Sequence, residues 1–393
     1  MDFEYPAEAE AFHDELLEFL EAELPPWWVN FLSGDERNIP FTREFCKKLA
    51  AKGWLTMAWP KEYGGGEADI WHQNVVREVM WGMGEPRGPQ YMNLNFIGPA
   101  IMTFGTDEQK DRYLKPMAAG EVIWCQGFSE QDAGSDLASL ATRAEDTGGG
   151  FRINGQKSWV SYGIYAEQCL LMARTDPDAP KHRGISMFVV DMATPGVAVR
   201  TIETVGGPPQ LYELTFEDVD IPYDALLGPR NDGWRVAMAA LDHERIGLAY
   251  GGRTQVQLDE LVGFAQETTD SSGRRLSERG DVRAKLIRLR ALNRAQRLIM
   301  YRVFADQTGA GAAVVDPSIY KVLGGQTTLQ AAQLAMELAG SRGALLEADP
   351  MATLGDGAYA WWGHALPVQV AGGSSEIQRN IIAQHGLGIP RGR

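Results

Sequence analysis

The order of the predicted secondary structure constrains the fold of this chain most. Residues 1–121 carry apolar residues at helical spacing, as Leu16 and Leu20 do, with breaks at glycine and proline. Residues 122–230 change to short β-rich runs separated by turns, and residues 231–393 return to long helical segments. Because strands do not alternate with helices, a Rossmann domain is disfavoured. We expect an α+β chain with a helical domain, a small antiparallel sheet domain and a second helical domain.

The size and charge of the chain exclude several classes of function. At 393 residues it exceeds one ordinary hydrophobic core, and its formal charge of −15 repels nucleic acid and anionic membranes. Its acidic start does not resemble a targeting signal, and no apolar stretch is long enough to span a bilayer. The three widely spaced cysteines fit a reducing cytoplasm, where we expect the protein. Metal-binding motifs such as HExxH and CxxC do not occur, so no metal is expected.

Two short patterns make local predictions. Thr106 followed by Gln109 at the third position is typical of a helix that begins with a capping box. Asn154-Gly155, between two alternating segments, favours the turn of a β-hairpin.

Three longer segments carry the functional signal: WCQGFSEQDAGSDLASL (124–140), NGQKSWVSYG (154–163) and VAGGSSEIQRNIIAQHGLGIPR (370–391). Together they resemble the acyl-CoA dehydrogenase family, and the order of helices, sheet and helices agrees over nearly the whole chain. The resemblance implies an N-terminal all-α domain, a central antiparallel β domain and a C-terminal four-helix bundle, usually assembled as a tetramer. It also implies FAD as cofactor and an acyl-CoA thioester as substrate.

The first two segments suit a flavin. A strand that ends in small hydroxyl side chains and free backbone N–H groups can meet the polar edge of the ring, and a tryptophan can cover its face. The resemblance also implies that Ser135 meets the pantetheine arm of the substrate. The residues to which it gives a cofactor role are Gln126, Phe128, Ser129, Ser135, Trp159, Ser161, Ser374 and Glu376.

The third segment departs from the best-known members of the family. They carry the catalytic glutamate at the position of Gly372, which cannot accept a proton. The resemblance then points to Glu244 in LDHER (241–245), the position used by isovaleryl-CoA dehydrogenase and by bacterial steroid side-chain acyl-CoA dehydrogenases. Asp242 and Arg245 lie where this family contacts substrate.

A mechanism follows from these assignments. Glu244 would accept the α-proton while the β-hydride passes to FAD, which gives a trans-2-enoyl-CoA. The backbone N–H of Gly372 would donate to the thioester oxygen as it gains negative charge. A base on a helix leaves space where the usual glutamate would stand, so we expect a branched, cyclic or steroid-like acyl group.

One family motif is missing. An Arg-x-x-Phe-Gly motif normally contacts the FAD diphosphate of a neighbouring subunit, but the corresponding stretch here is TTDSSGRRLSERG (268–280), and Glu337 replaces a glutamine. Either Arg274, Arg275 or Arg279 compensates, or a different subunit of a heterotetramer supplies the diphosphate half. A non-catalytic or half-site subunit is the alternative function. The resemblance to the family also implies an electron-transfer flavoprotein as the electron acceptor.

Overall fold

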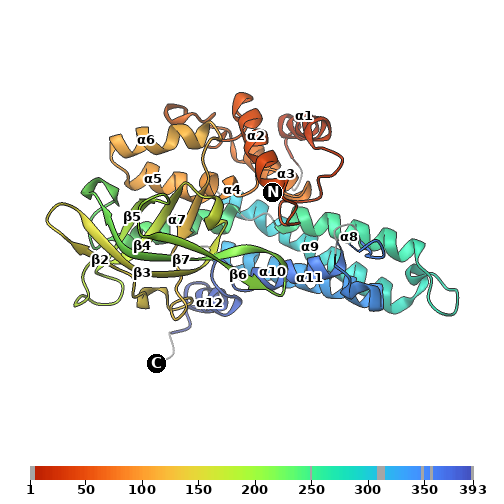
Figure 1. Ribbon diagram of the computed structural model, residues 1–393. Coiled ribbons are helices and arrows are strands. Elements are labelled where there is room, and N and C mark those ends of the chain that lie inside the picture. The colour runs from red at the N-terminus through yellow and green to blue at the C-terminus, as the bar shows by residue number, and fades with distance from the viewer. Residues whose placement is uncertain (1–4, 248–249, 308–314, 347–348, 355–356, 391–393) are drawn as a thin grey trace.

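The computed structural model describes the backbone of residues 5–247, 250–307, 315–346, 349–354 and 357–390. Within those ranges, the side chains of residues 207–209, 242–247, 250 and 304–307 are not described. Helices, a sheet and further helices follow one another along the chain (Figure 1), so the predicted α+β order is confirmed.

The N-terminal part is helical. Apolar residues at helical spacing bury one face of the first helix, where Leu16 and Leu20 are inaccessible to solvent. A π-helical turn, η2 (Asn93–Ile97), connects α4 to α5. The helices of this part are α1 (Ala7–Glu23), α2 (Asn38–Ala51), α3 (Ile70–Gly82), α4 (Gln90–Met92), α5 (Gly98–Phe104) and α6 (Asp107–Ala118).

Helix α6 begins as predicted. The Gln109 backbone N–H donates to Thr106 Oγ1 at 3.2 Å, and the Thr106 N–H donates to Gln109 Oε1 at 3.0 Å. The side-chain nitrogen of Gln109, Nε2, donates to the carbonyl oxygens of Asp224 and Leu226, at 2.8 and 2.9 Å. This buried side chain therefore caps a helix and also fixes that helix to the sheet domain.

The central strands form one eight-stranded sheet in the described part of the chain. The main order is β6-β7-β3-β2-β4-β5-β8, and β1 pairs with β4. Most neighbours are antiparallel, as expected, but β1 runs parallel to β4, and β2 meets β4 in a parallel pair. The strands are β1 (Trp124–Gly127), β2 (Arg143–Asp146), β3 (Phe151–Ser161), β4 (Gln168–Arg174), β5 (Ile185–Asp191), β6 (Val197–Thr204), β7 (Gly207–Ile221) and β8 (Leu226–Leu227).

The hairpin predicted at Asn154-Gly155 is wrong. Both residues lie inside β3, at a shift of its register against β7. The Asn154 side chain exchanges hydrogen bonds with Asp218 across that shift, at 3.1 and 2.9 Å. The turn between β2 and β3 instead uses residues 147–150, which include three consecutive glycines. Asparagine and glycine favour a bulge as readily as a turn, and here the long-range pairing decided between them.

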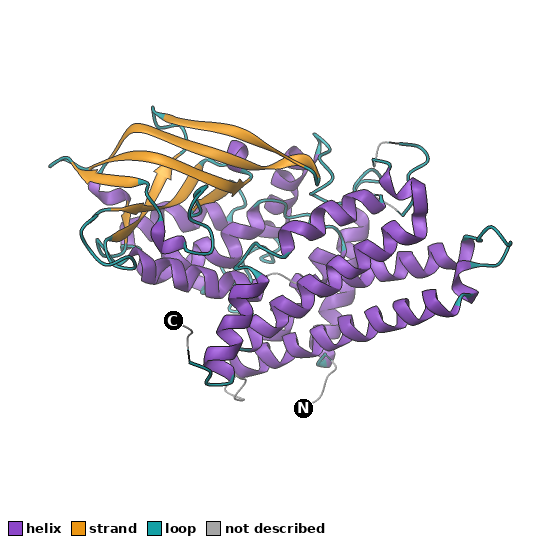
Figure 2. Ribbon diagram, turned by 90° about the horizontal axis from the view of Figure 1, so that it is seen from below, coloured by secondary structure: helices purple, strands orange, loops and turns teal. Residues whose placement is uncertain are grey.

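The C-terminal part is helical again. Helix α7 packs against η2, α5 and β5, while α8 to α11 form a bundle that extends away from the sheet (Figure 2). Among the described residues, none of the helices is long and apolar enough to cross a membrane. These helices are α7 (Gly233–Gly247), α8 (Tyr250–Glu267), α9 (Gly280–Gln307), α10 (Asp316–Ala339), α11 (Ala358–Val368) and α12 (Ser375–Ile381).

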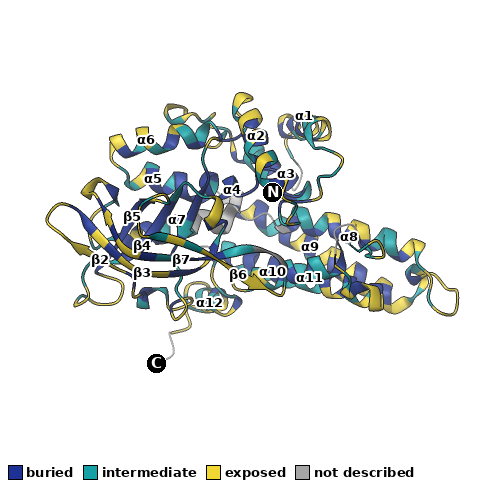
Figure 3. Ribbon diagram, in the orientation of Figure 1, coloured by how far each residue is buried: buried dark blue, intermediate teal, exposed yellow. Residues whose placement is uncertain are grey.

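The centre of the sheet, at β4 and β5, is buried on both faces. Along β4, Leu170 and Met172 pack into the core shared with the N-terminal helices, while Cys169 and Leu171 pack into the core on the other face. This alternation follows the pleat of a strand. Figure 3 shows the resulting buried band where the helices, the sheet and α7 meet. The three cysteines are free and buried.

Candidate functional site

A buried ion pair shapes the end of β1. The Lys157 ammonium, fully buried on β3, donates to Glu130 Oε1 at 2.8 Å and to the Phe128 carbonyl at 3.0 Å. The Glu130 carboxylate also accepts the backbone N–H groups of Ala141 and Thr142, at 2.6 and 2.9 Å. The segment after β1 is therefore held to β3 and to the start of β2 by one pair of side chains.

Burial and the opposite charge of the partner shift the pKa values of both Lys157 and Glu130. Burial lowers the pKa of Lys157 to about 8, although the Glu130 charge opposes this. Burial raises the pKa of Glu130. The charge of Lys157 and the hydrogen bonds from Lys157 and residues 141 and 142 lower that pKa by more, so it lies below its usual value. Both groups are thus charged at neutral pH, which suits a structural pair.

Sequence reasoning did not single out Lys157 or Glu130, although both lie in the quoted segments. The signal was present: Phe151, Ile153 and Lys157 fall on the same face of an alternating strand. A lysine at an inward position of a strand needs a buried partner.

Trp159 has an unusual conformation. Its φ angle is +64°, it lies where the β3–β7 register shifts between Lys157 and Val160, and the residue is 55% exposed. A non-glycine residue in the left-handed region costs about 1–2 kcal/mol, and an exposed indole gives no compensating burial in this chain alone. Strain of this kind is common where a ligand is held.

Gln126 has an unpaired donor. Its Nε2 atom is buried and has no hydrogen-bond partner among the described residues. Gln126 belongs to β1, next to β4, and the same strand leads into Phe128 and Ser129. The Ser129 carbonyl accepts the Ser158 N–H at 2.9 Å, so the segments of Gln126 and Trp159 are joined by backbone hydrogen bonding.

The remaining sheet residues are placed as follows. Phe128 is buried, and Ser129 and Ser161 are half-buried. Ser161 pairs with Leu211 of β7, two residues beyond Trp159. Ser135 is exposed in the loop after β1. The structure thus brings Gln126, Phe128, Ser129, Trp159 and Ser161 into two bonded segments, whereas Ser135 makes no hydrogen bond to either segment among the described residues.

The C-terminal loop has a tight turn. Gly372 and Gly373 have φ angles of +65° and +86°, and the Gly372 carbonyl accepts from Gln378 Nε2 at 2.9 Å. A Cβ atom on Gly373 would stand 2.7 Å from that nitrogen. Ser374 Oγ accepts the Ile377 N–H at 3.3 Å as the cap of α12, and Glu376 is exposed and pairs with Arg379. In this chain, Ser374 and Glu376 thus make contacts within their own helix.

The predicted base lies on α7. The backbone of Asp242, Glu244 and Arg245 is helical, but their side chains lie outside the described residues. Helix α7 packs between η2, β5 and α10, and Figure 1 shows it beside the strands of the sheet. The helix that carries Glu244 therefore contacts both helical parts and the sheet.

The region that corresponds to the missing motif consists of exposed ion pairs. Glu337 on α10 pairs with Lys285 on α9, at 2.6 and 2.7 Å. Arg279 pairs with Asp281, and Arg274 lies 3.8 Å from Asp270 of the same turn. The carboxylate at position 337 is neutralised, and Arg274 and Arg279 have carboxylate neighbours already.

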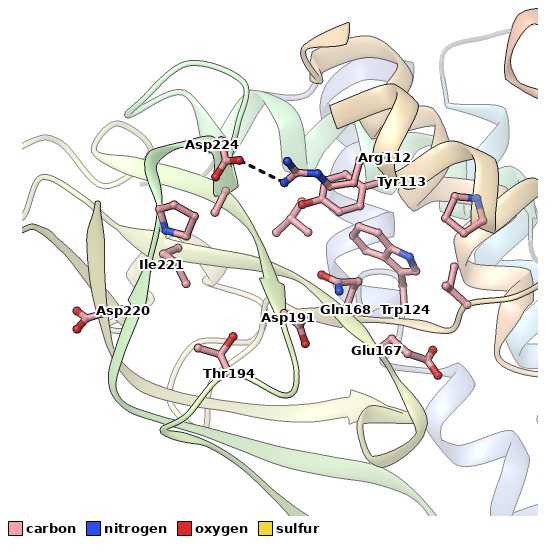
Figure 4. A pocket seen from close by; sticks show the side chains of 15 residues that line it. Arg112, Tyr113, Trp124, Glu167, Gln168, Asp191, Thr194, Asp220, Ile221 and Asp224 are labelled. Atoms are coloured by element: carbon pink, nitrogen blue, oxygen red, sulfur yellow. Dashed lines mark hydrogen bonds and ion pairs between the residues drawn. The ribbon is translucent and has the colours of Figure 1, made fainter. Parts of the chain in front are cut away.

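A cavity of about 370 Å³ lies elsewhere, between α6 and the ends of β1, β4, β5 and β7 (Figure 4). Arg112 and Tyr113 come from α6, and carboxylates such as Asp191 and Asp224 come from the sheet side. The predicted site residues do not line this cavity. It is therefore separate from the site that the sequence predicts.

Family models match almost the whole chain. The N-terminal domain of acyl-CoA dehydrogenases matches residues 6–121, the middle domain matches residues 125–219 and the C-terminal domain matches residues 231–387.

Individual relatives agree with these matches. The chain is 34% identical over 355 residues to the acyl-CoA dehydrogenase FadE26 of Mycobacterium tuberculosis, covering 89% of this chain and 88% of the relative. Among solved structures, the ChsE4-ChsE5 complex from Mycobacterium tuberculosis aligns with a TM-score of 0.89 and 32% identity over 100% of both chains. The Tcur3481-Tcur3483 steroid ACAD also aligns with a TM-score of 0.89, 32% identity and full coverage of both chains.

Proposed function

Because the chain belongs to the acyl-CoA dehydrogenase family, we propose that it oxidises an acyl-CoA thioester to the trans-2-enoyl-CoA with Glu244 as the base. Members of this family are FAD-dependent flavoproteins. The predicted family, three-part fold, oxidoreductase class and cofactor are thereby confirmed. The enoyl product, the acyl group and the individual site residues are our proposals, as are the domain boundaries at 121/122 and 230/231.

Trp159 is the observation that carries the flavin assignment. A planar ring that stacks on Trp159 would explain why a strained backbone holds its indole exposed. The unpaired Nε2 donor of Gln126 suits a carbonyl oxygen at the edge of such a ring. The residues present therefore fit FAD, with Gln126, Phe128, Ser129, Trp159 and Ser161 contacting the flavin ring. We also assign Ser374 and Glu376 to the cofactor, and Ser135 to the cofactor and the pantetheine arm.

The chain's own residues would do the following. FAD, when bound, supplies the acceptor for the β-hydride. Glu244 takes the α-proton, and Asp242 and Arg245 orient the substrate from the same helix. The N–H of Gly372 donates to the thioester oxygen, and the hydrogen bond from Gln378 to the Gly372 carbonyl holds that loop in place.

A branched, cyclic or steroid-like acyl group is proposed on two grounds. The position that usually carries the base is Gly372, which leaves space beside the reacting carbons. The Tcur3481-Tcur3483 neighbour is described as a steroid ACAD.

Glu244→Gln tests the base. We expect the rate constant of flavin reduction by substrate to fall by roughly 10²–10⁴-fold because the amide cannot accept the α-proton. Reduction of the bound flavin by substrate should be measured without an external acceptor, across a panel of linear, branched and ring-bearing acyl-CoA thioesters. Glu267→Gln, an exposed change at the end of α8, is the matched control and should leave the rate unchanged. Full activity of Glu244→Gln would remove the proposed mechanism.

We further propose that a second type of subunit completes the FAD site. Stretch 268–280 lacks the diphosphate motif, its arginines Arg274 and Arg279 face carboxylates of their own segment, and Glu337, which replaces a glutamine, is paired with Lys285. The ChsE4-ChsE5 and Tcur3481-Tcur3483 neighbours are described as pairs of different chains. A tetramer with such a partner fits these observations better than a tetramer of this chain alone. A half-site or non-catalytic subunit is the second candidate function.

Flavin retention tests the partner. The purified chain should be colourless or weakly yellow alone and should bind FAD at full stoichiometry after mixing with its partner subunit, as measured by absorbance of the eluted complex. Full FAD occupancy in the chain alone would contradict a required partner. Full occupancy of the mixture with no activity in any subunit combination would favour the non-catalytic role. An electron-transfer flavoprotein as acceptor and a cytoplasmic location complete the proposal.

A further inference from the structure

The side chain of Asn93 binds the backbone at the start of β1. Asn93 is the first residue of η2 and is 1% exposed. Its Nδ2 donates to the Val122 carbonyl oxygen at 2.7 Å, and its Oδ1 accepts the Trp124 N–H at 3.0 Å. These two backbone groups flank Ile123 and point to the same edge of the chain. The amide therefore takes the place that a neighbouring strand would occupy.

The two edges of this segment are held by different parts of the molecule. On one edge, Glu167 Oε2 accepts the Ile123 N–H at 2.7 Å, and the Glu167 N–H donates to the Ile123 carbonyl at 2.9 Å. Glu167 immediately precedes β4, so this edge belongs to the sheet. Asn93 holds the opposite edge and belongs to the N-terminal helices. Among the described strands, β1 pairs in the sheet with β4 alone.

Strand β1 carries part of the proposed flavin site between two anchors. Asn93 holds the start of the strand, and the Lys157 ammonium binds the Phe128 carbonyl just beyond its end. Gln126 lies between these anchors, in a strand of four residues. Because so short a strand has few pairing bonds of its own, a displacement at its start would also displace Gln126.

The turn that carries Asn93 also contacts the helix of the proposed base. Turn η2 packs against α7, and single π-helical turns of this kind are frequently found at functional sites. Two routes therefore connect α7 to β1. One passes through β5 and β4 within the sheet, and the other passes through η2. Asn93 supplies two hydrogen bonds to the second route.

We propose that Asn93 is a positioning residue, which sets the distance between β1 and α7. The flavin ring would lie on β1, and α7 carries Glu244. The inference rests on the proposed function, because it concerns the same two elements. Asn93 acts through the backbone of β1 and not by contact with substrate or cofactor. Reacting atoms must approach to about 3–3.5 Å, so a displacement of about 1 Å between the two elements lowers the rate strongly.

Asn93→Ala tests the inference in the protein loaded with FAD, together with its partner subunit if one is required. The probe is the acyl-CoA thioester that reduces the wild-type flavin fastest in the panel used for Glu244→Gln. We expect the rate constant of flavin reduction to fall by about 10- to 100-fold, while the half-saturating thioester concentration changes by less than about threefold. In the variant, an α-deuterated thioester should react more slowly than the unlabelled one.

A second measurement does not depend on activity. Amide hydrogen exchange of the FAD-free full chain, followed by mass spectrometry, reports on the anchor itself. Over residues 122–128, exchange should be about tenfold faster in Asn93→Ala than in the wild type, because the Trp124 N–H has lost its acceptor.

Gln90→Ala and Asn38→Ala are the matched controls. Gln90 is buried in the helix that leads into η2, and its Nε2 donates to the Gly120 carbonyl at 3.0 Å, four residues before β1. Asn38 is a buried asparagine at the start of α2 that donates to the Asn30 carbonyl and to Ser33 Oγ, both at 3.1 Å. Both variants lose buried hydrogen bonds, yet flavin reduction should stay within about twofold of the wild type.

Unchanged reduction in Asn93→Ala, or equal losses in the two controls, would overturn the inference and leave Glu244 in its proposed role. If Asn93→Ala does not fold, Asn93→Asp keeps the acceptor for the Trp124 N–H and loses the donor to Val122. This variant should show the same change at a smaller size, and unchanged reduction there would also overturn the inference. No flavin reduction by the wild-type protein with any thioester would contradict the proposed function and remove the inference with it.

Discussion

In the sheet, the Lys157–Glu130 pair is buried, whereas in the helical bundle the Lys285–Glu337 pair is exposed at both residues. The buried pair binds three backbone groups in addition to its own contact, so it fixes the path of the chain beside Trp159. The exposed pair joins two helices and fixes no loop. The comparison teaches that this chain fixes the backbone of the proposed flavin-ring site through a buried pair, whereas the pair in the bundle leaves the neighbouring backbone unconstrained.

Lys157→Met should give the largest loss of stability of the changes that compare the two pairs. Removal of one partner of a buried pair leaves an unpaired charge, so we expect the free energy of unfolding to fall by about 3 kcal/mol. Chemical denaturation measures this. Lys285→Met removes the exposed pair and should change stability by less than about 1 kcal/mol. Equal losses in the two variants would show that burial does not distinguish the two halves.

The pH dependence of Glu130→Gln gives a second, smaller effect. Because the pKa of Glu130 is lowered on folding, its contribution is present above the unfolded value of 4.5 and is lost as pH falls through the folded value. At neutral pH the variant should be about 2 kcal/mol less stable than the wild type, since hydrogen bonds to a charged group are lost. The difference should shrink steadily as the pH is lowered below 4.5. A difference independent of pH would show that the carboxylate charge is not involved.

Trp159 gives the smallest expected effect on stability. Trp159→Gly and Trp159→Ala should both weaken FAD binding, because the exposed indole is gone. The glycine variant should be more stable than the alanine variant by about 1 kcal/mol, since only glycine adopts a φ of +64° without strain. Thermal unfolding of the FAD-free proteins and FAD titration separate the two quantities. Unchanged FAD affinity in both variants would remove Trp159 from the flavin site.

Much of the architecture could be predicted from the sequence, and particular residues show why. The Thr106 capping box and the apolar spacing of Leu16 and Leu20 are local signals, and local hydrogen bonding and burial confirm them. Asn154-Gly155 is also a local signal, but pairing with a strand some 60 residues later places it inside a strand.

The candidate site was predictable in its segments and less so in its contacts. Resemblance selected Gln126 and Trp159, yet the left-handed conformation of Trp159 depends on a register shift that no local pattern indicates. Lys157 and Glu130 are 27 residues apart, and their contact requires the fold.

The Gln109 side chain restricts how the molecule can move. One amide group serves both the start of α6 and the carbonyl oxygens of Asp224 and Leu226. A hinge between the N-terminal helices and the sheet would have to break both bonds from Gln109 to the carbonyl oxygens of Asp224 and Leu226, in a buried environment. We therefore expect the N-terminal helices and the sheet to move together as one body.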